Sequence, residues 1–287
     1  MLAVITCFFN PHGLTQQIDN YYRFANAIAP VPLYTVEMSF SGQFSIQNSF
    51  KVNGCQNTQV LWQKERLLNL GIRHLPKQYD NIAWIDCDVL FTNPLWYEET
   101  ERLLEMYPVV QMFQKCHWLD LNGSVEKSRP SSASLGSYLK AGSDQSHPGF
   151  AWAARRSQIE QWGGLFDLDI TGNGDAWMTH AFYKEYDTAM TRAASLMLRQ
   201  SVLQWCERVA DLTGGQVAVV PGDVLHLFHG PLSERGYWDR FLIQQKHNYD
   251  PGSDIKIADN GAWQWNSVKA DFHREVASRF GPLKIGK

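Results

Sequence analysis

Two aspartates, Asp86 and Asp88, follow directly on the apolar run Ile82-Ala83-Trp84-Ile85. The whole segment 82–91 is strand-like, and alternate side chains of a strand point to one face. We therefore expect both carboxylates on the same side, at the carboxyl end of a central strand, where open α/β sheets bind ligands. Adjacent carboxylates repel, and a divalent cation relieves that repulsion. A bare D-x-D more often caps the next loop, here at Thr92 and Asn93, but the apolar setting favours a metal site.

A late apolar segment, His226-Leu227-Phe228-His229, offers two imidazoles. A lone histidine on an apolar strand is more often a core or surface residue than a ligand. Spacing alone does not separate His226 from His229. Carboxylate, water and phosphate oxygens suit Mg²⁺ or Mn²⁺, and an added imidazole favours Mn²⁺.

Asp175 is the candidate catalytic base. It follows Gly172 and Gly174 at the start of an expected helix, where the helix dipole favours an ionised carboxylate. The alternative is that Asp175 is simply the residue that caps this helix.

The elements that must position these residues alternate between strand and helix. This alternation predicts one α/β domain with a mainly parallel sheet flanked by helices. We expect loops at 41–58 and 115–147, the second a functional lid or a partly disordered segment. The expected strands are 2–9, 32–40, 82–91, 108–113, 149–154, 217–220 and 224–228, and the expected helices are 15–29, about 60–71 with Gly71 at the end, 94–106, one ending at Trp162, and about 174–186.

Composition excludes several classes of protein. In 287 residues, 44% apolar and 19% charged side chains rule out disorder and coiled coil. The longest apolar runs are far below the roughly 20 residues that span a bilayer, and no cleavable leader is evident, so we expect neither a membrane nor a secreted protein. A net charge of −3 disfavours non-specific binding of nucleic acid. Five cysteines without a C-x-x-C pair argue against a disulfide framework and structural zinc, and fit a cytoplasmic protein.

Residues 82–91, followed by Asn93-Pro94-Leu95-Trp96, resemble the D-x-D strand of nucleotide-sugar-dependent glycosyltransferases of the GT-A fold, family-2-like. Later motifs recur in the order of that family, and the resemblance covers residues 2 to about 245. These motifs are His147-Pro148-Gly149-Phe150-Ala151-Trp152-Ala153, Gly163-Gly164-Leu165-Phe166-Asp167, Gly172-Asn173-Gly174-Asp175 and His226-Leu227-Phe228-His229-Gly230.

The resemblance implies a Rossmann-like GT-A domain over 1–248, with a nucleotide-sugar-binding half (1–114), an acceptor-binding half (115–248) and a C-terminal tail (249–287). Asp86 would lie near the donor ribose or bind metal through water, and Asp88 would bind the metal that bridges the diphosphate. In the family, the late histidine is followed by a small residue and a basic loop. Residues 230–235 match this pattern after His229, which favours His229 over His226 as the metal ligand. Arg235 would contact phosphate, or lie on the surface as a solvated arginine.

The nucleotide would be held where this fold usually grips base and ribose, at Thr6, Phe8 and Asn10 on the exit of the first strand and at Glu37 on the second. Glu37 has the alternative of a strand-end acid facing water. Lys64 and Arg66 would either neutralise phosphate or lie exposed to solvent on the outer face of the second helix, and the exposed position is favoured.

The sequence therefore predicts a metal-dependent glycosyltransferase that uses Mn²⁺ or Mg²⁺ and a nucleotide-diphosphate sugar, with a UDP-sugar favoured. An inverting transfer is favoured over a retaining one, although Ala176 stands where many inverting members carry a second acid. The acceptor stays open between a surface polysaccharide, a lipid-linked sugar, a protein and a hydroxymethylated DNA base; overall acidity weighs against DNA, although Arg274, Arg279, Lys284 and Lys287 form a basic cluster.

Two alternatives come from other classes. A nucleotidyltransferase should carry a glycine-rich, basic phosphate loop after the first strand, which Asn10-Pro11-His12-Gly13 is not. A catalytically inactive carbohydrate-binding protein of the same fold is the other alternative.

Overall fold

The structure is a computed structural model that describes residues 1–11, 13–137, 146–232 and 237–280. Arg235, Lys284 and Lys287 lie outside the described residues, as does part of the loop predicted at 115–147.

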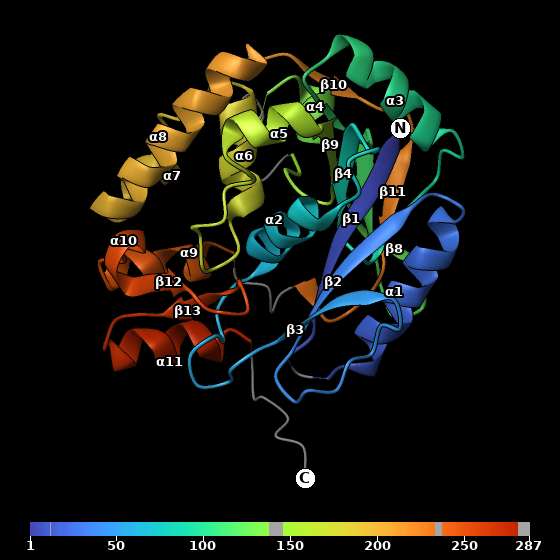
Figure 1. Cartoon of the computed structure of the whole chain (residues 1–287). Coiled ribbons are helices and arrows are strands. Elements are labelled where there is room, and N and C mark those ends of the chain that lie inside the picture. The colour runs from blue at the N-terminus through green and yellow to red at the C-terminus, as the bar shows by residue number, and fades with distance from the viewer. Residues whose placement is uncertain (12, 138–145, 233–236, 281–287) are drawn as a thin grey trace.

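A seven-stranded sheet forms the centre of the molecule (Figure 1). Its order is β10-β6-β9-β4-β1-β2-β3, and every neighbouring pair is parallel except those of β9, which runs antiparallel between β4 and β6. This confirms the predicted α/β class with a mainly parallel sheet. The strands are β1 (Leu2–Phe9), β2 (Leu33–Ser39), β3 (Ser49–Asn53), β4 (Asn81–Ile85), β6 (Val109–Gln111), β9 (Ala151–Arg155) and β10 (Val217–Val219).

Helices cover both faces of this sheet. Along β1, Ala3 and Ile5 belong to one hydrophobic cluster and Leu2 and Val4 to another, as the alternation of a strand buried on both faces requires. The first cluster joins the sheet to α2, α5, α6 and α8, and the second joins it to α1 and α3. The helices are α1 (Thr15–Ile28), α2 (Lys64–His74), α3 (Trp96–Met106), α4 (Ser132–Leu135), α5 (Arg156–Trp162), α6 (Gly174–Phe182), α7 (Ala189–Ala193) and α8 (Leu196–Thr213).

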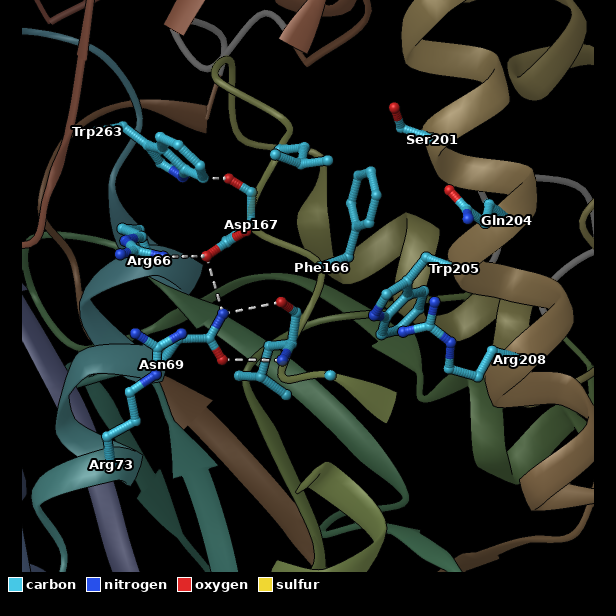
Figure 2. A pocket seen from close by; sticks show the side chains of 13 residues that line it. Arg66, Asn69, Arg73, Phe166, Asp167, Ser201, Gln204, Trp205, Arg208 and Trp263 are labelled. Atoms are coloured by element: carbon cyan, nitrogen blue, oxygen red, sulfur yellow. Dashed lines mark hydrogen bonds and ion pairs between the residues drawn. The ribbon is translucent and has the colours of Figure 1, made fainter. Parts of the chain in front are cut away.

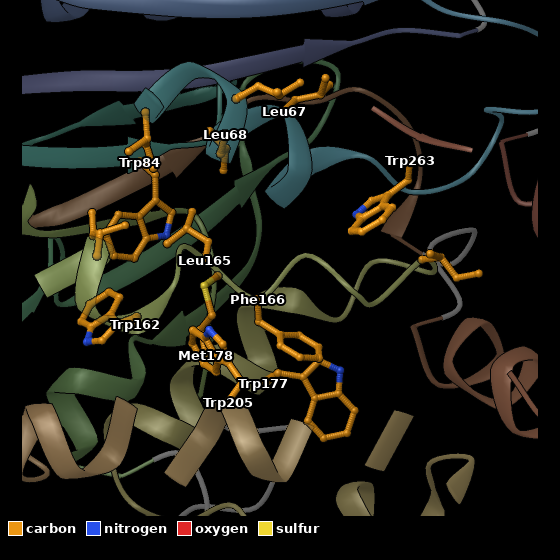
Figure 3. Close-up of a cluster of buried hydrophobic side chains, with 14 of the residues drawn as sticks. Leu67, Leu68, Trp84, Trp162, Leu165, Phe166, Trp177, Met178, Trp205 and Trp263 are labelled. Carbon is orange, nitrogen blue, oxygen red and sulfur yellow. The ribbon is translucent and has the colours of Figure 1, made fainter. Parts of the chain in front are cut away.

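Large aromatic side chains fill the first cluster. Figure 3 shows Trp84 of β4, Trp162 of α5 and Trp177 of α6 between α2 and α8. All three indoles are almost completely buried. These three tryptophans therefore fill the core.

A second, four-stranded sheet lies against the first and supplies part of the candidate site. Its order is β5-β11-β7-β8, and its strands are β5 (Val89–Phe91), β11 (Asp223–His226), β7 (Lys115–Leu119) and β8 (Val125–Pro130). Two predictions are corrected by this sheet. Segment 82–91 is not one strand, because the chain turns after Ile85 to leave the main sheet. The region 115–137 is not a loop without secondary structure, because it forms β7, β8 and α4.

Three further boundaries differ from the prediction. The loop predicted at 41–58 contains edge strand β3, and the helix predicted at 174–186 ends at Phe182. Gly71 does not end the second helix but lies inside α2, where an added Cβ would lie 2.4 Å from Ile5 Cδ1. Glycine therefore lets α2 pack closely on β1. Helix α8 was not predicted.

The C-terminal segment packs on the same core as α2. It comprises α9 (Tyr237–Lys246), α10 (Pro251–Asp254), β12 (Ile255–Ile257), β13 (Trp263–Trp265) and α11 (Ala270–Ser278). Tyr249, Trp263 and Phe272 belong to the first hydrophobic cluster. Among the residues described, no helix combines the length and apolar character needed to span a membrane.

Candidate active site

Three potential metal ligands meet where the two sheets adjoin. One ligand atom each from Asp88, His226 and His229 lies within 4.8 Å of the others. The Asp88 Oδ2 atom is 3.6 Å from His226 Nε2 and 3.4 Å from His229 Nε2. The structure therefore brings together the second aspartate of the D-x-D pair and both late histidines, although about 140 residues separate them along the chain.

The pairing of β5 with β11 creates this proximity. Val89 lies opposite His226 in the antiparallel register, and the Leu227 amide donates to the Asp88 carbonyl over 2.8 Å. His226 is only 3% exposed and stacks on the Phe150 ring at a centroid distance of 4.8 Å, whereas the side chain of His229 is 27% exposed. Packing thus fixes the first imidazole, and the second lies at the surface of the site.

A second cluster is centred on Lys64. Its Nζ atom lies 2.6 Å from Asp86 Oδ1 and 2.9 Å from Asp175 Oδ2, and its side chain is 13% exposed. The favoured interpretation, that Lys64 is a solvent-exposed residue on the outer face of the helix, was wrong, because the start of α2 points this side chain at the start of α6. Arg66 is also buried rather than exposed on that face.

The turn that carries both aspartates joins the two clusters. Asp86 and Asp88 do not extend along one strand face as predicted, because β4 ends at Ile85. Asp86 instead contacts Lys64, and Asp88 lies with His226 and His229. In the described part of the chain, Asp86 is not a member of the candidate metal cluster.

Asp175 does not cap its helix. Asn173 occupies the N-cap position of α6. The buried Asp169 accepts hydrogen bonds from the amides of Thr171, Gly172 and Asn173 and thereby satisfies the polar groups of this loop. The alternative of a capping role for Asp175 is therefore wrong, and its carboxylate is directed to Lys64.

The segment with the predicted motif His147-Pro148-Gly149-Phe150 lies beside both clusters. A Cβ added to Gly149 would lie 2.7 Å from Asp175 Oδ2 and 3.3 Å from His147 Nε2. The Asp86 amide donates to the Phe150 carbonyl over 2.7 Å. Glycine at position 149 thus allows Asp175 and the main chain to approach closely, and His147 is a neighbour of the site that the motif contained but to which no role was assigned.

Glu65 is a second residue that sequence reasoning missed. Its carboxyl group is buried, accepts a hydrogen bond from Trp62 Nε1 over 2.9 Å, and fills the space that a Cβ at Gly174 would occupy. Burial raises the pKa of Glu65 to about 8, against the opposing effect of Lys64. Nothing in the pattern of α2 marked this acid, because charged residues on helices usually face water.

Burial and neighbouring charges also shift the pKa values of Asp86 and Lys64. Burial raises the pKa of Asp86 to about 7, although Lys64 counteracts this shift. Burial alone would lower the pKa of Lys64, but the adjacent carboxylates of Asp175 and Asp86 outweigh that effect and raise it well above its ordinary value. Lys64 therefore stays charged and holds the two aspartates together.

Stability should fall as Glu65 ionises. Because its pKa in the folded protein is above the ordinary carboxyl value, the folded state holds this proton up to about pH 8 and the unfolded state loses it near pH 4.5. The contribution of Glu65 to the free energy of unfolding is therefore complete below its unfolded-state pKa of 4.5. It is lost as the pH rises through the folded-state pKa of about 8. In denaturant titrations, the free energy of unfolding should fall between about pH 5 and pH 9 by at least ~1.4 kcal/mol more for the parent than for Glu65→Gln. If the free energy of unfolding changes equally with pH in the parent and in Glu65→Gln, the raised pKa of Glu65 is contradicted.

Most residues predicted to hold the nucleotide are engaged within the fold. Thr6 is buried and donates to the Ile85 carbonyl, and Phe8 is buried against Tyr21. The Asn10 side chain bonds both main-chain groups of Leu14.

Glu37 is also buried rather than exposed at a strand end. Its carboxylate accepts hydrogen bonds from the amides of Ser45 and Ile46 and from the Ser49 hydroxyl. It therefore holds the 45–49 loop. Of the nucleotide-binding set, the structure brings Lys64 and Asp86 together, and Arg235 is not described.

Comparison with known proteins gives similarity only at the level of solved structures. No protein-family model and no curated protein matches this chain. The chain is similar to the catalytic domain of Drosophila beta1,4galactosyltransferase 7 in complex with xylobiose, at 13% identity over 95% of this chain and 97% of that one, with a TM-score of 0.44. It is also similar to glucosyl-3-phosphoglycerate synthase from Mycobacterium tuberculosis in complex with Mn²⁺, uridine diphosphate and phosphoglyceric acid, at 15% identity over 89% and 81% of the chains, with a TM-score of 0.44.

A complex of the same mycobacterial enzyme with Mg²⁺ and uridine diphosphate gives 13% identity over 93% and 87% of the chains and a TM-score of 0.42. Such identities and TM-scores assign no activity, substrate or metal to this chain. Its function therefore has to be inferred from its own residues.

Proposed function

We propose that this protein is a metal-dependent glycosyltransferase that moves a sugar from a nucleotide-diphosphate donor, favoured as a UDP-sugar, to an acceptor hydroxyl. One observation carries the proposal: the turn Asp86-Cys87-Asp88 joins a cluster of metal-ligand type to a cluster with a candidate base. The first cluster suits a bound diphosphate, and the second suits proton transfer. A sheet edge that carries both groups has the parts that sugar transfer from a diphosphate requires.

The donor atoms of the first cluster fit Mn²⁺ or Mg²⁺. Asp88 supplies carboxylate oxygens and His226 and His229 supply imidazole nitrogens, a mixed set that favours Mn²⁺ over Mg²⁺. When bound there, the cation would offset the negative charge that gathers on the leaving diphosphate. The β5–β11 pairing and the hydrogen bond from the Leu227 amide to the Asp88 carbonyl hold Asp88 and His226 together, and His229 follows three residues after His226.

Asp175 is proposed as the base. The acceptor hydroxyl attacks the anomeric carbon, the bond between that carbon and the diphosphate oxygen breaks, and the hydroxyl proton passes to Asp175. Because Oδ2 is bound by Lys64, we assign the other carboxylate oxygen, Oδ1, as the acceptor of the proton. Lys64 orients the carboxylate through its contact with Oδ2 at 2.9 Å. Direct attack with a separate base gives inversion at the anomeric carbon.

The same proposal assigns the binding of donor and acceptor to different halves of the chain. Residues 1–114 would bind the nucleotide-sugar and residues 115–248 the acceptor, and the protein would act in the cytoplasm. Asp86 would lie at the donor through its contact with Lys64. The acceptor class stays open among polysaccharide, lipid-linked sugar, protein and modified DNA base.

Binding of UDP and Mn²⁺ to the purified chain tests the proposal. A ligand at about 100 times its Kd adds about 2.7 kcal/mol of stability, so UDP with Mn²⁺ should raise the Tm by about 5 °C. UDP alone or Mn²⁺ alone should give a clearly smaller shift. An equal response to nucleoside triphosphates with a sugar phosphate would favour a nucleotidyltransferase. Tight donor binding without any metal-dependent donor hydrolysis would favour an inactive binding protein.

A further inference from the structure

A cavity lies between α2 and α8, away from both clusters of the candidate active site (Figure 2). Its volume is about 280 Å³. One wall carries Arg66, Asn69 and Arg73 of α2, the floor is the loop 163–168, and Trp263 of β13 lies at one end. The opposite wall is a stripe of α8 formed by Ser201, Gln204, Trp205 and Arg208.

Helix α2 serves the two sites with different faces. Spacings of three and seven residues place Arg66, Asn69 and Arg73 on one face of the helix. At about 100° per residue, Lys64 is rotated by about 200° from Arg66 and lies on the opposite face. The cavity is therefore separate from the Lys64 cluster, although a single helix builds both.

Hydrogen bonds from both walls hold the floor in place. Asn69 accepts from the Leu165 amide over 2.8 Å and donates to the Leu165 carbonyl over 2.9 Å. From the other wall, Trp205 Nε1 donates to the Gly164 carbonyl over 3.2 Å. Trp263 Nε1 donates to the Asp167 carbonyl over 2.8 Å. The cavity is thus preformed, which lowers the entropic cost of binding.

The lining carries positive charge. Three of its side chains are arginines and one is an aspartate. Arg66 offsets the aspartate, because its Nη1 atom lies 3.3 Å from Asp167 Oδ2. Arg73 and Arg208 remain on opposite walls, and both are exposed. Within the described residues, the Arg73 guanidinium makes no hydrogen bond or ion pair, and that of Arg208 donates to the Trp162 carbonyl.

We propose that this cavity binds a small ligand that carries an oxyanion, a phosphate or carboxylate group on a molecule the size of a single sugar. Guanidinium groups match the geometry of both oxyanions. The volume lies just below the usual range of ligand pockets, roughly 300–1,000 Å³, and fits a group the size of a single sugar. Ser201 and Gln204 offer partners for hydroxyl groups. The proposal is independent of the glycosyltransferase function.

Calorimetric titration of the parent tests it with four probes: inorganic phosphate, glucose 6-phosphate, glucuronate and glucose. The oxyanions should bind and neutral glucose should not. The double variant Arg73→Gln/Arg208→Gln should weaken binding at least about tenfold, since hydrogen bonds to charged groups are the strong ones. Arg23→Gln, a change at an exposed arginine of α1, is the matched control and should leave binding unchanged.

A second variant tests the position without removing charge. Gln204→Trp places a large ring on the exposed α8 wall and should block sugar-sized probes while the Tm is kept. Binding of glucose 6-phosphate alone, of glucuronate alone or of both identifies the oxyanion. Absence of saturable binding, or binding that survives both variants, overturns the proposal. The double variant should keep its response to UDP and Mn²⁺, so failure here is distinguishable from failure of the proposed function.

Discussion

Asp88→Asn should abolish the stabilisation of the protein by UDP with Mn²⁺ and lower sugar transfer by at least about 10²-fold. The substitution keeps the size of the side chain and removes the carboxylate that, among the described residues, lies in the cluster with His226 and His229. Loss of a group that merely orients a ligand already lowers metal affinity by about 10- to 100-fold, so loss of a ligand should cost at least as much. Calorimetry with Mn²⁺ in the presence of UDP measures the first effect, and transfer from a UDP-sugar measures the second.

The matched control is Asp80→Asn. Asp80 is exposed and immediately precedes β4, whereas Asp88 lies beyond its other end, so the control tests the same change of charge away from the site. It should bind UDP and Mn²⁺ as the parent does. Asp88→Asn should also keep the Tm of the unliganded parent within a few degrees. If it retains the parent's Mn²⁺ affinity, the metal assignment is wrong.

Six of the seven strands of the main sheet, all but β3, were predictable because their signals are local. The apolar run of β4 and the turn residues after β1 mark strands without reference to any partner. Helix α8 carries a local signal as well, because its buried Leu198, Val202, Trp205 and Val209 recur at helical spacing. The sequence of this segment is therefore sufficient to predict the helix.

The internal geometry of the site was not predictable in the same way. The motif order identified Asp88 and the late histidines as candidates, but the contact depends on the β5–β11 pairing between distant segments. The environment of Lys64 depends on how the start of α2 meets the start of α6, and neither helix encodes that meeting. Thr6 and Phe8 failed as exposed ligands because β1 lies in the middle of the sheet, where both faces are covered.

Asp175→Asn should lower the rate of sugar transfer by about 10²- to 10⁴-fold and leave the binding of UDP and Mn²⁺ unchanged. The lower rate reflects loss of a general base, because an amide cannot accept the proton of the acceptor hydroxyl. Donor binding should survive, since Asp175 is not among the metal-ligand residues. Lys64 keeps its contact with Asp86 at 2.6 Å, so the substitution does not leave the buried ammonium group without a carboxylate.

Turnover per folded molecule separates a catalytic from a structural role for Asp175. Asp187→Asn, at an exposed aspartate that pairs with Arg192, is the control and should retain full turnover. A lower Tm for Asp175→Asn with turnover per folded molecule preserved would reduce Asp175 to a structural partner of Lys64. The anomeric configuration of the product gives an independent test, because direct attack assisted by Asp175 inverts the donor's configuration. A product that retains this configuration would remove the need for a base on the acceptor side, even if the metal site is correct.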